Sequence, residues 1–124
     1  MKKSGILNAE LSRIVAGLGH GDLLVIADAG LPVPAGVPCV DLAVTLGVPA
    51  MLEVLDTVLS EMCVETAFRA EEAGAVGGEI DARVQCDLVS HEVFKERSAG
   101  AVAVVRTGEG TPYANVGLVS GVVF

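Results

Sequence analysis

Two short, uninterrupted apolar runs restrict the fold of this chain more than any other feature. They lie at residues 23–27 (LLVIA) and 101–105 (AVAVV). A strand that is apolar at every position is typical of a sheet covered on both faces, because both sets of alternating side chains are then buried. Segments with helical spacing separate these runs. The pattern therefore predicts a single three-layer α/β domain, in which helices flank a central sheet that is largely parallel or mixed.

The rest of the chain supplies the other elements of this fold. We predict helices over residues 9–18, 49–62 and 90–94, and further strands over residues 64–68, 84–88 and 116–124. Residues 30–38 contain three prolines, which exclude a regular helix or a central strand and indicate an ordered loop. Residues 74–78 are small and predict a flexible connection. No linker or repeat interrupts the pattern, so we assign one domain to residues 1–124.

Composition excludes several classes of partner. A net charge of −8 disfavours nucleic acid and anionic membrane surfaces, both of which attract basic proteins. No apolar run reaches the roughly 20 residues that a membrane-spanning helix needs. Cys39, Cys63 and Cys86 are widely spaced and form neither a disulfide framework nor a zinc motif. Together with the lack of a secretory signal pattern, they predict a cytoplasmic protein.

The apolar fraction is high for so short a chain. Apolar residues make up 52% of 124 residues, and a small domain has a large surface for its volume. Part of the apolar surface should therefore be covered by other subunits. We predict a homo-oligomer.

The two histidines are the first candidates for acid–base chemistry, because imidazole titrates near neutral pH. His20 precedes the apolar run 23–27, and Asp28 follows it. A five-residue strand spans roughly 17 Å, so these two side chains should lie at opposite ends of it within one subunit. Simple structural interpretations remain open: His20 as a surface turn residue, Asp28 as a turn former, and His91 as a first-turn helix residue.

A second group of candidates lies in the segment GEGTPYAN at residues 108–115. It joins two predicted strands and contains the only tyrosine, Tyr113, together with Asn115. Both side chains can orient hydroxyl groups, although Asn115 could also simply complete a turn. The glycines do not form a nucleotide-binding motif, and the chain shows no ligand cluster typical of a metal site.

Four segments taken together resemble the D-ribose pyranase family, whose relatives include L-fucose mutarotases. They are LGHGD at 18–22, DAGLPVP at 28–34, SHEVFK at 90–95 and GEGTPYAN at 108–115. The resemblance covers nearly the whole chain. It departs from the family between Glu72 and Val84, where we expect a Gly-rich connection in place of a helix.

The resemblance implies a cofactor-free isomerase acting on free D-ribose. It implies that His20 is the catalytic proton donor and that the sugar is bound by Asp28, His91, Tyr113, Ala114 and Asn115. It also implies decamers of stacked rings with active sites between subunits. An L-fucose mutarotase and a noncatalytic sugar-binding module are the alternatives, and a phosphoryl carrier using His20 ranks last because no Lys or Arg adjoins that residue.

Overall fold

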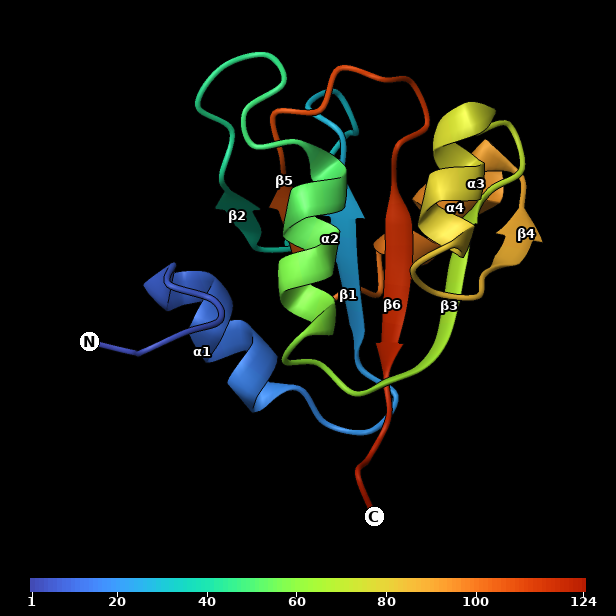
Figure 1. The fold of residues 1–124 in the computed structure, drawn as a ribbon. Coiled ribbons are helices and arrows are strands. Elements are labelled where there is room, and N and C mark those ends of the chain that lie inside the picture. Colours follow the sequence, from blue (N-terminus) through green and yellow to red (C-terminus); the bar gives the residue numbers. More distant parts are fainter.

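Helices and short strands alternate along the chain in the computed structural model, which describes residues 1–124 (Figure 1). In chain order the elements are α1 (Ala9–Gly17), β1 (Leu23–Ala27), β2 (Cys39–Asp41), α2 (Met51–Leu59), β3 (Val64–Ala70), α3 (Ala75–Asp81), β4 (Asp87–Val89), α4 (His91–Ser98), β5 (Ala103–Arg106) and β6 (Val116–Ser120). None of the helices combines the length and apolar character needed to cross a membrane.

The six strands form one mixed sheet in the order β2-β5-β1-β6-β3-β4. β1 is parallel to β5, β5 to β2, and β3 to β4, whereas β6 is antiparallel to both of its neighbours, β1 and β3. Figure 1 shows β1 and β6 side by side with their arrows reversed. Five strands therefore end at the same edge of the sheet, and β6 begins there.

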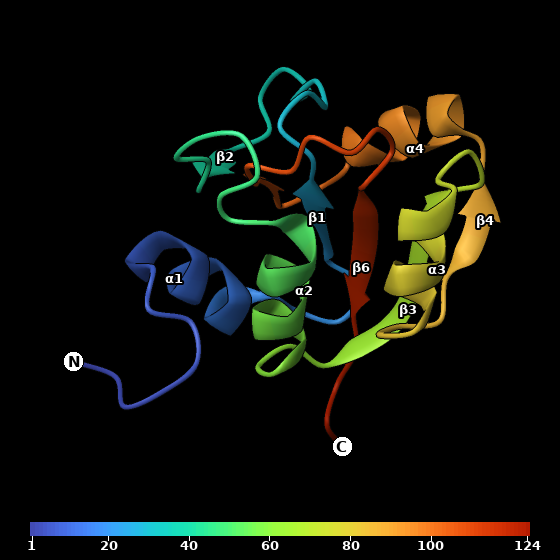
Figure 2. The same cartoon turned by 45° about the horizontal axis from the view of Figure 1, so that its top comes forward.

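Helices cover both faces of this sheet, as the apolar runs predict. Leu24 and Ile26 of β1 point into a core that also contains the buried residues of α1 and α2. Val25 and Ala27 point to the opposite face, where they pack with Phe94 of α4. Figures 1 and 2 show α2 and α3 on one side of the sheet and α4 on the other. The predicted three-layer architecture is confirmed.

The predicted N-caps form as well. The Asn8 side chain accepts a hydrogen bond from the backbone N–H of Leu11 at 2.9 Å, and the Ser90 hydroxyl accepts one from Val93 at 3.2 Å. These bonds satisfy N–H groups that the first turn of a helix leaves free. α4 continues to Ser98, beyond the predicted end at Phe94, because Phe94 and Ser98 are both buried against the sheet.

The expectation of a Gly-rich connection between Glu72 and Val84 is wrong, since α3 occupies this segment. Ile80 of α3 is fully buried in the core. Asp81 accepts two hydrogen bonds from the Arg69 guanidinium, at 2.9 and 2.7 Å, which attaches the helix to β3. This ion pair lowers the pKa of Asp81. Tertiary contacts thus stabilise a helix whose two glycines give it poor intrinsic propensity.

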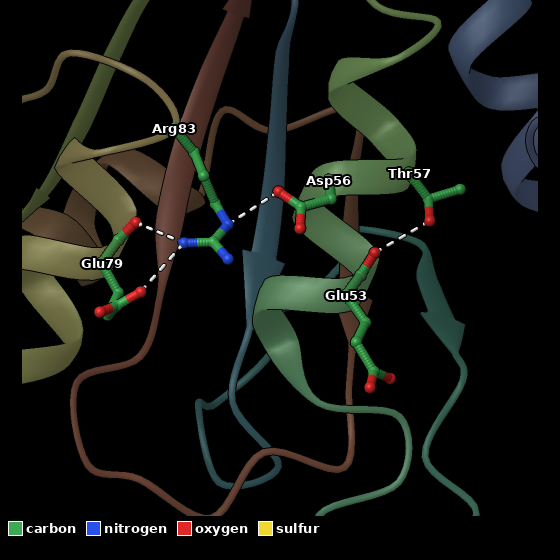
Figure 3. Close-up of polar contacts among 5 residues, drawn as sticks. All are labelled: Glu53, Asp56, Thr57, Glu79 and Arg83. Atoms are coloured by element: carbon green, nitrogen blue, oxygen red, sulfur yellow. Dashed lines mark hydrogen bonds and ion pairs between the residues drawn. The ribbon is translucent and has the colours of Figure 1, made fainter.

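A second contact joins α3 to α2. Arg83 follows α3, and its Nε donates to Asp56 of α2 at 2.7 Å (Figure 3). Its Nη1 donates back to Glu79 of α3, to the carbonyl oxygen at 2.8 Å and to the carboxylate at 3.2 Å. The two helices on this face are therefore linked by one guanidinium.

Two neighbouring glycines of α3 give a matched test of this packing. A Cβ at Gly77 would lie 2.6 Å from Nη1 of Arg69, whereas one at Gly78 would meet nothing within 4 Å. Gly78→Ala should stabilise the fold by up to about 1 kcal/mol through helix propensity. Gly77→Ala must displace a guanidinium that Asp81 holds, and should be about 1 to 3 kcal/mol less stable than Gly78→Ala. Urea unfolding of both variants measures the difference, and equal stabilities would contradict this account.

Candidate active site

The carboxyl edge of the sheet brings together most of the residues that the sequence singles out. Asp28 follows β1, His91 begins α4 directly after β4, and Tyr113, Ala114 and Asn115 precede β6. Clefts at this edge are the usual ligand sites of open α/β sheets. A cavity of about 390 Å³ lies there, lined by Asp28, Ala29, Gly30, Leu31, Pro32, His91, Glu109, Gly110, Thr111, Pro112 and Tyr113.

Asp28 and Asn115 form a reciprocal pair in the floor of this site. The backbone N–H of Asp28 donates to Oδ1 of Asn115 at 2.8 Å, and Nδ2 of Asn115 donates to Oδ2 of Asp28 at 3.1 Å. The backbone N–H of Gly30 donates to Oδ1 of Asp28 at 2.9 Å. Asn115 is fully buried, so it holds the carboxylate rather than meeting solvent. Each Asp28 oxygen keeps a lone pair for a further donor.

Tyr113 stands at the mouth of the cavity in a constrained conformation. Its φ is +63°, in the left-handed region that non-glycine residues rarely adopt. Its carbonyl oxygen accepts a hydrogen bond from the backbone N–H of Asn115 at 2.8 Å, which closes the turn. Ala114 is fully buried in the core and is not among the residues that line the cavity. The conformation directs the phenol ring toward the cavity wall formed by His91.

His91 contacts Tyr113 edge-on, with ring centroids 5.0 Å apart and an interplanar angle of 78°. The backbone N–H of His91 donates to both carboxylate oxygens of Glu72 at 3.0 Å. Its Nδ1 is buried and has no hydrogen-bond partner within the chain. The imidazole is thus fixed by packing and by the start of α4.

His20 lies at the other end of β1, as the strand length predicts. Its side chain is 59% exposed, and its Nε2 lies 3.2 and 3.1 Å from the two carboxylate oxygens of Glu65. Glu65 belongs to β3, which starts beside the end of β6. Within one chain, His20 does not join the cavity that contains Asp28. Glu65 is a partner of His20 to which the sequence reasoning assigns no role.

Glu109 is a second site residue that sequence reasoning missed. Its Oε1 accepts a hydrogen bond from the backbone N–H of Met51 at 3.1 Å, and its Oε2 accepts from the hydroxyl and N–H of Thr111 at 2.9 and 3.3 Å. Burial opposes ionisation of Glu109, but the backbone and hydroxyl donors outweigh it and lower its pKa. An acidic residue between two glycines was the only sequence signal.

The charges of the cavity favour a neutral ligand. Its lining includes two carboxylates, Asp28 and Glu109, and neither Lys nor Arg. A phosphorylated ligand would be repelled, whereas carboxylate, amide, imidazole and phenol groups suit a molecule rich in hydroxyls. Nowhere in the chain do three or more His, Cys, Asp or Glu side chains gather in a way that could hold a metal ion.

Comparison with known proteins identifies the family. The model of the RbsD / FucU transport protein family matches residues 1–123. The chain belongs to this family. A D-ribose pyranase of Bacillus cereus is 49% identical over 131 aligned positions, which cover 100% of both chains.

Two solved structures of family members share the fold of this chain. Bacillus subtilis RbsD complexed with D-ribose is 46% identical and covers 100% of both chains, with a TM-score of 0.92. The Streptococcus pneumoniae fucose mutarotase in complex with L-fucose is 25% identical and covers 100% of both chains, with a TM-score of 0.85. The resemblance to ribose pyranases and fucose mutarotases that the four sequence segments indicate is confirmed.

Proposed function

We propose that this RbsD / FucU family member is a D-ribose pyranase, an isomerase that interconverts the pyranose and furanose forms of free D-ribose. The main support is full-length similarity to D-ribose pyranases, with identical residues at nearly half of all positions. In addition, the cavity presents groups that can bind hydroxyls and contains neither Lys nor Arg. The three cysteines are free, as is usual in the reducing cytoplasm, and we place the protein there. We assign the proposed activity to ribose catabolism.

The cavity residues are proposed to hold the sugar. Asp28, fixed by Asn115 and Gly30, accepts hydrogen bonds from one or two sugar hydroxyls. His91 and Tyr113 contact the remaining hydroxyls, and Ala114, which is fully buried beside Tyr113, supports that residue from the core. A pentose carries several donors and acceptors around a small ring, so a few fixed partners suffice to orient it.

His20 is proposed as the proton donor, supplied to the cavity by a neighbouring subunit. It lies at the end of β1 opposite Asp28, so one chain does not bring the two together. A head-to-tail contact between copies would place the His20 end of one subunit against the cavity of the next. A heterologous contact of this kind forms a ring when the rotation between successive subunits closes, and two stacked rings of five would give the decamer that we propose.

The chemistry needs two proton transfers and no cofactor. Ring opening removes a proton from the anomeric hydroxyl and adds one to the ring oxygen. We assign the second transfer to His20 and the orientation or acceptance of the hydroxyl proton to Asp28. Closure of the free aldehyde through a different hydroxyl converts pyranose into furanose, and closure through the same hydroxyl on the other face changes the anomer.

Substrate preference provides the test of this proposal. We expect faster exchange between β-ribopyranose and β-ribofuranose than between the anomers of L-fucose, measured by saturation-transfer NMR at matched sugar and enzyme concentrations. The methyl group of L-fucose alone should change binding by about 1 to 3 kcal/mol, and its different hydroxyl configuration should add to the preference. Faster fucose exchange would make the chain an L-fucose mutarotase. Binding without accelerated exchange of either sugar would indicate a noncatalytic sugar-binding module.

A further inference from the structure

Glu109 contacts more segments of the site than any residue to which we have given a role. Its main-chain N–H donates to Oγ1 of Thr107 at 3.2 Å, and its carbonyl oxygen accepts from the backbone N–H of Ala29 at 2.9 Å. Its carboxylate accepts from the N–H of Met51 and from Thr111. One residue therefore connects the end of β5, the loop after β1, the start of α2 and the loop of residues 107–115, which we call the cavity loop.

These contacts place Glu109 between a rigid support and the sugar-binding groups. Met51 is fully buried at the first position of α2, and the N-cap of that helix, Ala50, has no side chain that can cap it. Glu109 supplies the missing acceptor from elsewhere in the chain. On its other side, Thr111 leads directly to Tyr113. The carboxylate therefore ties the cavity loop to a helix that is packed in the core.

We propose that Glu109 is a positioning residue that holds the loop of residues 107–115 in the conformation that binds the sugar. This inference rests on the proposed function. Glu109 acts through Tyr113 and through Ala29, the neighbour of Asp28. It has no assigned role in proton transfer, so its loss should weaken substrate binding more than it slows the chemical step.

The geometry requires a carboxylate and not an amide. The groups that face the two Glu109 oxygens within hydrogen-bond distance are all donors, from Met51 and Thr111. A glutamine has the same shape but carries one acceptor oxygen and one NH₂ group. In Glu109→Gln, the NH₂ group must face the donor of either Met51 or Thr111. One of the two contacts that hold residue 109 is therefore lost.

The test compares Glu109→Gln with Glu53→Gln. Glu53 is an exposed residue in the first turn of the same helix, and its carboxylate points away from the Asp56–Arg83 pair (Figure 3). Glu53→Gln thus removes the same charge near the same helix terminus without touching the cavity loop. For ribose exchange, Glu109→Gln should raise KM about tenfold and change kcat less than about threefold. Glu53→Gln should leave both values unchanged.

A second variant separates positioning from helix capping. Ala50→Ser gives α2 its own N-cap acceptor. In Ala50→Ser/Glu109→Gln the thermal stability should recover while KM stays high, and this result would support the proposal. Recovery of a normal KM would show that Glu109 only caps the helix, and an unchanged KM in Glu109→Gln would also overturn the proposal. Absence of ribose exchange in the unmodified protein would instead contradict the proposed function itself.

Discussion

Replacement of His20 by alanine should reduce ribose exchange by about 10² to 10⁴-fold, the usual contribution of a general acid. The fold should not change, because the His20 side chain is 59% exposed and makes its only side-chain hydrogen bonds with Glu65. Saturation-transfer NMR gives the exchange rate, and circular dichroism with thermal unfolding gives the stability. Activity within a factor of two of the parent would remove His20 from the mechanism.

A milder variant serves as the control for that result. Glu65→Gln keeps the imidazole of His20 and replaces its carboxylate partner by an uncharged group of the same shape. If Glu65 only orients the ring, the loss of exchange should be clearly smaller than in His20→Ala. An equal loss would assign Glu65 a direct part in proton transfer.

Two inactive variants should restore activity when they assemble together. His20→Ala lacks the donor and Asp28→Asn lacks the carboxylate, and each homo-oligomer should be nearly inactive. If every site takes His20 from one subunit and Asp28 from the next, random mixing in equal amounts leaves about a quarter of the sites intact. Co-expression, or unfolding and refolding of the mixture, should therefore recover about a quarter of the parental exchange rate.

The controls for this experiment are the two variants refolded separately and then combined without exchange of subunits. Light scattering should show the same large homo-oligomer for the parent, both variants and the mixture. A mixture that stays inactive although its subunits have exchanged would contradict an intersubunit site. A fully active monomer would contradict it as well.

Much of the fold could be predicted because apolar patterns record burial directly. β1 matches its predicted bounds of 23–27, since every residue of that run is apolar. β2 was missed because it is a three-residue strand at the sheet edge, too short to show a period. α3 was missed because its stability comes from Arg69 and from the burial of Ile80, which no local pattern records.

The candidate site shows the same contrast between local residue patterns, which a sequence reveals, and long-range contacts, which it does not. The residue types indicated Asp28, His91 and Tyr113, together with their positions at a strand end, at a helix start and between two strands. The pairing of Asp28 with Asn115 joins residues 87 positions apart, and the bond from Met51 to Glu109 joins residues 58 apart. Hydrogen bonds of this kind depend on how strands are ordered in the sheet. That order has no signature in a single sequence, so the acidic residue between two glycines was too weak a signal to assign a role to Glu109.

The central position of β6 affects how the protein must fold. β6 is the last strand in chain order, yet it alone joins β2-β5-β1 to β3-β4. Until it is inserted, the edges of β1 and β3 stay unpaired, and Asp28 lacks its Asn115 partner. Pairings between segments so distant in sequence form slowly, because the loop between them must close first. Before β6 has been synthesised, the other strands can form only the separate groups β2-β5-β1 and β3-β4, and the sugar cavity becomes complete only after residue 120.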